Sequence, residues 1–265
     1  MQIQEDVFNG CTAIITGSCG DGIGRSAAML LGSLGCNIVL NYGTYNSGTE
    51  YEKQANKVAE AINNLGGRAI IAKADTKNED EVRSIVDKTL QQFGSVDFLI
   101  INSGSNWNAR DVVDIPYFEW KNTLSAEIDA VFLLFKNVAP IMRKKRSGRI
   151  IILGLSNALN TNNLNNMAFD YRLGRAVRSW ISSSLGHLEY PEICINVIEP
   201  GYIEGLSFKE SLECIKRESE GHIIENNTPT CHDVAKAIVF LCSPFAKHIS
   251  QSIIHIPTHI LPVDR

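Results

Sequence analysis

A glycine-rich turn between an apolar run and a helical pattern constrains the fold of this chain more than any other stretch. Ala13, Ile14 and Ile15 predict a buried strand, and Gly17, Gly22 and Gly24 follow directly before a second apolar pattern. Glycines let a backbone turn tightly and approach a ligand closely, and the next helix presents free N–H groups to phosphate. The turn therefore predicts a phosphate cradle. A glycine-rich connection without a ligand is the alternative interpretation.

Short apolar runs alternate with longer helical patterns along the chain. We expect strands at residues 12–16, 37–41, 68–73, 96–102, 149–154, 193–198 and 252–257, and helices at 24–34, 49–65, between 78 and 94, and at 117–145, 167–188 and 231–242. This alternation is typical of βαβ units in a sheet with helices on both faces. The prediction is a three-layer, doubly wound α/β fold with a mostly parallel seven-stranded sheet, in a single domain over residues 1–265.

Two segments interrupt this rhythm. The stretch from Asn160 to Asn166 carries five asparagines, which favour turns, and the stretch from Glu204 to Thr230 is polar and irregular. Ligands of open α/β sheets bind beyond the carboxyl ends of the strands, where both segments fall. We expect them to form a substrate wall and, at about 204–230, a lid. A plain surface insertion is the alternative.

Composition excludes several classes of function. The formal net charge of −4 gives no reason to expect nucleic acid or an anionic membrane as a partner. The seven cysteines show no C-x-x-C pattern, which favours reduced thiols and a cytoplasmic location. We find no secretion signal and no apolar stretch of membrane-spanning length. The six histidines do not form a metal-ligand pattern, so we expect no metal.

The glycine turn is the first of several short motifs along the chain. In sequence order they are Thr16-Gly17…Gly22-Ile23-Gly24, Asp75-Thr76, Asn102-Ser103-Gly104, and Asn196-Val197-Ile198-Glu199-Pro200-Gly201. In this order they resemble the motifs of the short-chain dehydrogenase/reductase family, specifically its 3-oxoacyl-carrier-protein-reductase-like branch. The resemblance covers nearly the whole chain. It implies a Rossmann fold and hydride transfer between a nicotinamide and a carbonyl or alcohol carbon.

The resemblance also implies a set of cofactor-binding residues. These are Gly17, Ser18, Gly22, Ile23, Gly24, Asn41, Tyr42, Asp75, Thr76, Asn102, Gly104, Pro200 and Gly201. The second strand ends in the neutral pair Asn41-Tyr42, where NAD-preferring members carry an acidic residue for the ribose 2′-hydroxyl. We therefore favour NADP(H) over NAD(H). Arg25 is the nearest basic candidate for a 2′-phosphate, whereas Asp21 would repel a phosphate if it pointed inward.

The catalytic group implied by the resemblance is Ser156, Tyr171 and Arg175, where the family has Ser and Tyr-x-x-x-Lys. A tyrosine with an ordinary pKa of about 10 is a poor base at neutral pH, so a cation one helical turn away is needed to favour the phenolate. Arg175 keeps that charge and spacing. The enoyl-reductase branch would place the cation at Arg178 instead. Family spacing for the serine falls on Ala158, and Ser156 is the serine close to it.

A second departure from the family lies on the preceding long helix. Glu127 stands where the family has an asparagine that supports a proton relay. Two departures in one site suggest a coupled change, so we expect Glu127 to pair with Arg175. Such a pair would weaken the pull of the cation on Tyr171.

Three functions compete at this point. The first is an NAD(P)(H)-dependent oxidoreductase acting on a carbonyl or alcohol of a small-molecule or acyl-thioester substrate. The second is a lyase, because the halohydrin dehalogenases, which resemble this family, use Ser, Tyr and Arg, the last two as Tyr-x-x-x-Arg, without nicotinamide. Those enzymes fill the nucleotide loop with an aromatic halide pocket, whereas this chain keeps the glycines there. The third is a catalytically silent binding protein. By analogy with the family, helices 117–145 and 167–188 would form a homodimer or homotetramer.

Overall fold

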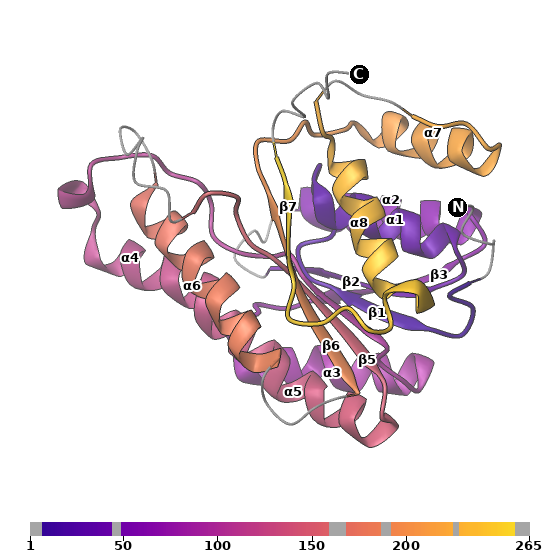
Figure 1. Cartoon of the computed structure of the whole chain (residues 1–265), viewed down its shortest axis with the longest axis horizontal. Coiled ribbons are helices and arrows are strands. Elements are labelled where there is room, and N and C mark those ends of the chain that lie inside the picture. Colours follow the sequence, from indigo (N-terminus) through magenta and orange to yellow (C-terminus); the bar gives the residue numbers. More distant parts are fainter. Residues whose placement is uncertain (1–6, 44–48, 159–167, 187–191, 225–227, 258–265) are drawn as a thin grey trace.

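The computed structural model describes residues 7–43, 49–158, 168–186, 192–224 and 228–257. Its middle layer is a seven-stranded sheet in the order β3-β2-β1-β4-β5-β6-β7, with every neighbouring pair parallel (Figure 1). The strands are β1 (Thr12–Ile15), β2 (Asn37–Tyr42), β3 (Arg68–Lys73), β4 (Phe98–Ile101), β5 (Gly148–Leu153), β6 (Ile193–Pro200) and β7 (Ile253–Ile256). The strand order reverses between β1 and β4, which places a ligand crevice at their carboxyl ends. The predicted doubly wound fold is confirmed.

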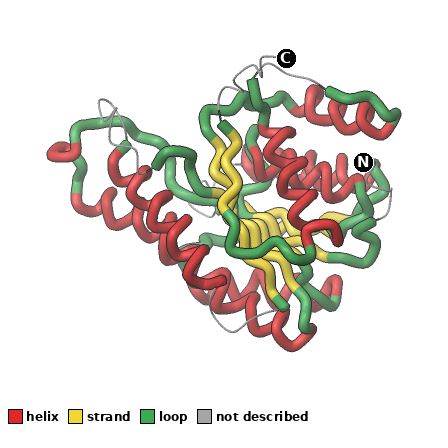
Figure 2. Tube along the Cα trace, in the orientation of Figure 1, coloured by secondary structure: helices red, strands yellow, loops and turns green. Residues whose placement is uncertain are grey.

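Helices cover both faces of the sheet (Figure 2). One face carries α1 (Ile23–Ser33), α2 (Thr49–Asn64) and α8 (Cys231–Cys242), and the other carries α3 (Glu79–Phe93), α5 (Ala130–Lys145) and α6 (Phe169–Gly186). The helix α4 (Tyr117–Leu124) joins α5 through a π-helical turn, Ser125–Asp129. Two 3₁₀ turns occupy Val112–Asp114 and Pro244–Ala246. No helix in the described part of the chain is both long enough and apolar enough to cross a membrane.

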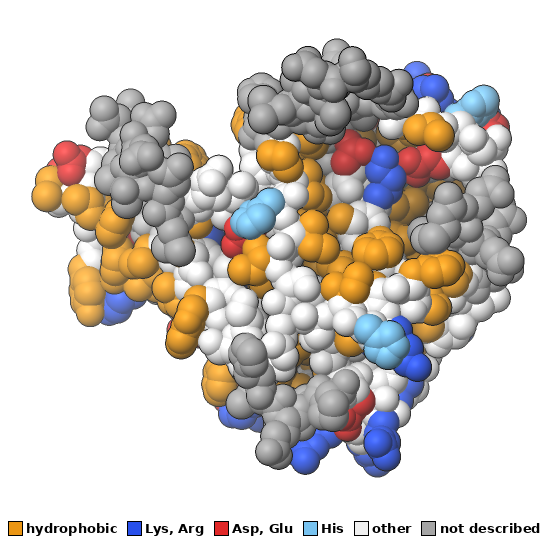
Figure 3. Space-filling model, in the orientation of Figure 1, with side chains coloured by type: hydrophobic (Ala, Val, Ile, Leu, Met, Phe, Trp, Pro, Cys, Tyr) orange, Lys and Arg blue, Asp and Glu red, His pale blue; other side chains and the backbone are white. Residues whose placement is uncertain are grey.

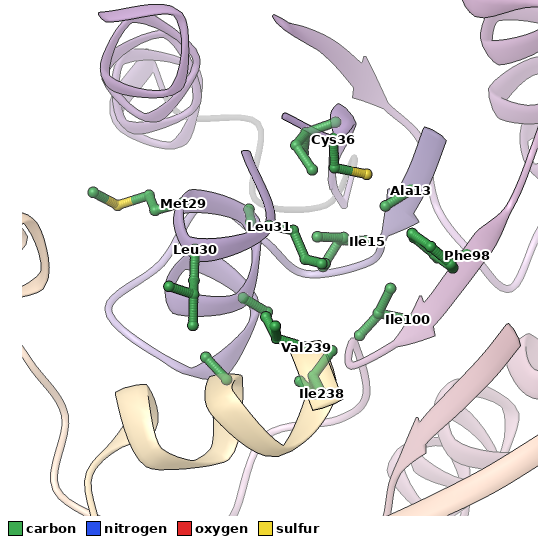
Figure 4. Close-up of a cluster of buried hydrophobic side chains, with 14 of the residues drawn as sticks. Ala13, Ile15, Met29, Leu30, Leu31, Cys36, Phe98, Ile100, Ile238 and Val239 are labelled. Carbon is green, nitrogen blue, oxygen red and sulfur yellow. The ribbon is translucent and has the colours of Figure 1, made fainter. Parts of the chain in front are cut away.

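Alternating side chains of the strands build a separate core on each face. Ile15 and Ile100 pack with Leu31 of α1 and Val239 of α8 (Figure 4), whereas Ile14 belongs to the core beneath α3 and α5. Because both faces of a parallel strand are buried, its sequence is a continuous apolar run. That is why the strand positions could be predicted from the apolar runs of the sequence.

One helix was not predicted. The segment 204–230 contains α7 (Phe208–Ser219), which begins with a capping box between Ser207 and Glu210. Glu210 N–H donates to the Ser207 hydroxyl at 3.2 Å, and Ser207 N–H donates to the Glu210 carboxylate at 2.7 Å. The expectation of an irregular segment here was wrong for these residues. The asparagine-rich stretch, residues 160–166, lies outside the described residues.

The helix α7 packs against α1 rather than standing free. The ring centre of Phe208 lies 4.2 Å from Lys57 Nζ of α2 and 5.8 Å from the guanidinium carbon of Arg25 in α1. Arg25 also donates to the carbonyl of Leu206 and forms an ion pair with Asp21. A single buried arginine therefore joins the glycine turn, α1 and the start of α7.

Candidate active site

A cavity of about 280 Å³ lies at the carboxyl ends of the first four strands. Its wall contains Gly17, Cys19, Gly20, Asn41, Tyr42, Gly43, Tyr51, Ala74, Asp75, Thr76, Lys77, Asn102, Ser103, Gly104, Ser105, Asn106, Ala126 and Arg175. The fold thus brings together seven of the predicted cofactor residues, namely Gly17, Asn41, Tyr42, Asp75, Thr76, Asn102 and Gly104. The other six, Ser18, Gly22, Ile23, Gly24, Pro200 and Gly201, are not in this wall, and their roles stay predictions.

Hydrogen bonds between β1 and β4 fix the glycine turn in place. The Asn102 side-chain amide donates to the carbonyls of Thr16 at 3.1 Å and Gly17 at 2.9 Å. In return, the Thr16 hydroxyl accepts the backbone N–H groups of Asn102 and Ser103, each at 3.0 Å. The turn is therefore held from two sides before any ligand binds.

Two glycines are required by this geometry. Gly17 has a φ of +63°, which favours glycine. A Cβ on Gly24 would lie 2.3 Å from the Gly17 carbonyl oxygen, so only glycine lets the first turn of α1 approach the loop. Gly22 differs, because a Cβ there would meet no atom within 4 Å. The packing around Gly22 therefore does not require a glycine there.

The two charged residues of the turn region, Asp21 and Arg25, do not line the cavity. Asp21 pairs with Arg25, and the Arg25 residue is only 3% exposed. The basic candidate for a 2′-phosphate is thus committed to Asp21 and α7. Lys77 is the lysine of the wall; its Nζ donates to the side chain of Asn122 at 2.6 Å and lies 3.6 Å from Asp75.

The other end of the cavity reaches α6. Arg175 lies in the wall, and the carbon of its guanidinium is 4.9 Å from the ring centre of Tyr171, one turn earlier. The Tyr171 ring also packs edge-on against Trp107, with ring centres 5.5 Å apart. Arg175 Nη1 donates to the carbonyl of Leu153 at 2.7 Å, at the end of β5. Arg175 therefore connects Tyr171, the cavity and β5.

Ser156 lies in a turn three residues after β5 ends and is half-buried. Its backbone N–H donates to the carbonyl of Pro200 at 3.0 Å. Gly201 is held in turn, since its N–H donates to the carbonyl of Ile256 at 2.8 Å. The serine and the predicted Pro200-Gly201 pair thus lie together at the carboxyl ends of β5 and β6.

Glu127 is presented by the π-helical turn and is fully buried. One carboxylate oxygen accepts from Ser105, from the N–H at 2.7 Å and the hydroxyl at 2.9 Å. The other lies 3.0 Å from Arg175 Nε, so the expected ion pair between Glu127 and Arg175 is present. A Cβ on Gly104 would lie 2.4 Å from the carboxylate and 2.7 Å from Arg175 Nη2. Only glycine fits between these groups.

The sequence analysis missed the part that Arg178 takes in this cluster. Arg178 is fully buried and donates to Glu127 at 2.9 Å and to the carbonyls of Ile101 at 3.2 Å and Ser103 at 2.8 Å. Burial lowers the pKa of Arg178 to about 10; Arg175 also lowers it, and Glu127 opposes both effects. The sequence named Arg178 only as the alternative to Arg175 for the cation that acts on Tyr171, and not as a partner of Glu127. Arg178 is not in the cavity wall.

Comparisons with known proteins place this arrangement in a family. A family model described as enoyl-(acyl carrier protein) reductase matches residues 18–257. The 7alpha-hydroxysteroid dehydrogenase of Escherichia coli is 28% identical over 249 residues, covering 93% of this chain and 92% of that protein. The 3-oxoacyl-[acyl-carrier-protein] reductase FabG of Staphylococcus aureus is 28% identical over 247 residues, covering 92% of this chain and 96% of that protein.

A solved structure shows the same relationship. A 7 alpha-hydroxysteroid dehydrogenase complexed with NADH and 7-oxo glycochenodeoxycholic acid superimposes with a TM-score of 0.78 at 27% identity, covering 97% of this chain and 96% of that one. These relatives carry the names of dehydrogenases and a reductase, which favours neither the lyase nor the silent alternative. The chain belongs to the short-chain dehydrogenase/reductase family of NAD(P)-dependent oxidoreductases.

Proposed function

We propose that this protein reduces a carbonyl group, or oxidises the corresponding alcohol, of a small or carrier-bound acyl-thioester substrate with NADP(H). One observation carries the proposal: a single cavity joins the glycine turn to Arg175, and Arg175 lies against Tyr171. A dinucleotide site and a candidate acid/base are therefore continuous. The S. aureus relative, named as a 3-oxoacyl-carrier-protein reductase, supports the thioester class.

The residues of the cavity fit a dinucleotide. Gly17 and Gly24 let the turn and the start of α1 pack closely, and the N-terminus of α1 supplies N–H groups for phosphates. Asn41 and Tyr42 would face the adenine ribose, Asp75 and Thr76 the adenine, and Asn102 and Gly104 the nicotinamide ribose. The remaining predicted contacts are Ser18, Gly22 and Ile23 in the turn and Pro200 and Gly201 beyond β6. A bound nicotinamide supplies the hydride.

The catalytic steps fall to three side chains. Tyr171 donates a proton to the carbonyl oxygen during reduction and accepts it during oxidation. The Ser156 hydroxyl donates a hydrogen bond to the same oxygen and so stabilises its developing charge. Arg175 favours the phenolate by its charge. Because a guanidinium keeps its protons, Arg175 does not relay a proton, and Tyr171 must exchange its proton with water or a hydroxyl.

NADP(H) is favoured over NAD(H) by the wall of the cavity near β2. The strand ends in Asn41 and Tyr42, so no carboxylate stands there to bind a 2′-hydroxyl. The Asn41 amide is held by the carbonyls of Ala72 and Ala74, and Lys77 lies in the same wall. The relative solved with NADH makes the choice a matter for direct measurement.

We assign the lid to residues 204–230 within a single domain over residues 1–265. Glu204 and Thr230 pair in a β-bridge, which closes the base of the segment. Its helix α7 is connected to α1 by Arg25. Movement of this segment would therefore act on the glycine turn through Arg25.

Nucleotide titration tests the cofactor. We expect NADPH to bind about tenfold more tightly than NADH, since one additional charge-assisted contact contributes roughly 1.4 kcal/mol. Fluorescence titration measures both dissociation constants, and oxidation of NADPH is then followed with ketones and 3-oxoacyl thioesters. Equal binding, or a preference for NADH, would contradict the NADP(H) assignment. Absence of binding would exclude a reductase, and binding without turnover would favour a silent protein.

Replacement of the catalytic side chains tests the mechanism. We expect Tyr171→Phe to lower kcat by about 10²–10⁴-fold and Ser156→Ala by about 10²-fold, while the dissociation constant of NADPH stays nearly constant. Steady-state kinetics and titration measure the two effects separately. Tyr117→Phe is the matched control, because Tyr117 is exposed on α4 and should keep its activity. A Tyr171→Phe variant with ordinary kcat would refute the assignment of the acid/base.

An apolar surface on the helices suggests self-association. Phe118 of α4, Phe132 of α5 and Trp180 of α6 are 69%, 54% and 70% exposed. Hydrophobic atoms also gather over the end of the molecule that α4 and α6 form in Figure 3. Exposed apolar patches of this kind often mark interfaces. We therefore propose a homodimer or homotetramer formed through these helices.

Sedimentation measures this association. We expect the protein to sediment as a dimer or tetramer and Trp180→Glu to shift it toward the monomer, because the variant places a charge in an apolar interface. Ile223→Glu is the control, since Ile223 is 83% exposed after α7. An unchanged assembly in Trp180→Glu, or a monomeric parent protein, would contradict the interface.

A further inference from the structure

A single buried carboxylate lies between two buried guanidiniums. The same oxygen of Glu127 is 3.0 Å from Arg175 Nε and accepts from Arg178 Nη1 at 2.9 Å. All three residues are at most 7% exposed. Charges in such a place interact strongly, because little water screens them.

The two arginines have different surroundings. Arg175 lines the cavity and lies against Tyr171, so its charge reaches the site. Arg178 directs its Nη groups inward, to Glu127 and to the carbonyls of Ile101 and Ser103. Its guanidinium thus ties α6 to the end of β4 and to the π-helical turn. None of these contacts belongs to a substrate or cofactor.

Counting charges shows what Arg178 changes. Glu127 contributes one negative charge and the two arginines two positive ones, so the cluster is positive by one. Without Arg178, Glu127 would neutralise Arg175, and no net charge would face Tyr171. The expectation that Glu127 weakens the effect of Arg175 on Tyr171 therefore leaves out the opposing charge of Arg178. Arg178 stays protonated at neutral pH, since its pKa is about 10.

We propose that Arg178 is a positioning residue of the active site, which compensates the charge of Glu127 and so leaves the positive charge of Arg175 acting on Tyr171. The catalytic consequence rests on the proposed function. The electrostatic claim does not, because phenolate formation can be measured without turnover.

Other charged groups near Tyr171 are constant in the test. Asp170 and Arg172 are its buried neighbours on α6, and Arg172 donates to the carbonyl of Asn157 at 3.0 Å. The side chain facing Tyr171 from the β4–α4 loop is the uncharged Trp107. On α4, Glu119 is paired with Arg110, which precedes that helix. Variants within the cluster leave these groups unchanged, so differences between variants report the cluster alone.

The experiment is a charge series. Arg178→Gln makes the cluster neutral, Glu127→Gln makes it positive by two, and the double variant restores a net charge of one. Positive surroundings stabilise the phenolate. We therefore expect the midpoint of phenolate formation to rise by about one pH unit in Arg178→Gln and to fall by about one in Glu127→Gln. The double variant should return to the parent value. Arg178→Lys, which keeps the charge, should keep the midpoint but lower kcat.

Two readouts are compared. Ultraviolet titration of each protein, minus the same protein with Tyr171→Phe, gives the midpoint directly, and the pH profile of alcohol oxidation should move with it. Arg149→Gln, which removes a half-buried arginine at the opposite end of β5, is the control and should leave the midpoint unchanged. If turnover is absent but the midpoints follow the charge, the proposed function fails and this inference stands.

The inference is overturned if the midpoint of folded Arg178→Gln equals that of the parent, or if the two single variants move it in the same direction. If the variants lose thermal stability and kcat but their midpoints do not follow the net charge of the cluster, Arg178 has only a structural role. If Arg178→Gln does not fold, Glu127→Gln and Arg178→Lys decide. A lowered midpoint in the first and an unchanged one in the second support the inference, and any other pair of results contradicts it.

Discussion

A buried carboxylate must be paired, and in this protein that constraint organises the whole site around Glu127. An unpaired charge at this depth would cost several kcal/mol. Arg175, Arg178 and Ser105 supply the partners. Glycines supply the space, because a Cβ on Gly174 would lie 2.7 Å from the Glu127 side chain and one on Gly104 even closer to its carboxylate. Arg175, Arg178 and Glu127 therefore form one coupled cluster of charges.

The end of β4 connects this cluster to the glycine turn. The N–H of Ser103 donates to the Thr16 hydroxyl, while the carbonyl of the same residue accepts from Arg178. Asn102 completes the connection through the carbonyls of Thr16 and Gly17. Two consecutive residues, Asn102 and Ser103, therefore join the glycine turn to the Glu127 cluster.

Local patterns in the sequence were sufficient for the fold, and they named seven of the residues that line the cavity. Buried parallel strands are continuous apolar runs, and caps such as Asn78, whose side chain accepts from two N–H groups of α3, can be recognised locally. The capping box of Ser207 and Glu210 could have identified α7, but the polar composition of the segment concealed it. Arg178 could not be predicted, because its partners come from β4 and from a π-helical turn. Neither the turn nor the face of α6 that becomes buried is evident from spacing alone.

The most direct test of this account is a double-mutant cycle in stability between Glu127 and Arg178. Unfolding in denaturant is measured for the parent, Glu127→Gln, Arg178→Gln and the double variant. The account predicts a coupling of about 2–3 kcal/mol, with the double variant losing less stability than the sum of the two single losses, because Glu127 and Arg178 share one buried ion pair that is lost only once. Additive losses of stability would contradict it, since the carboxylate would then be held independently of Arg178.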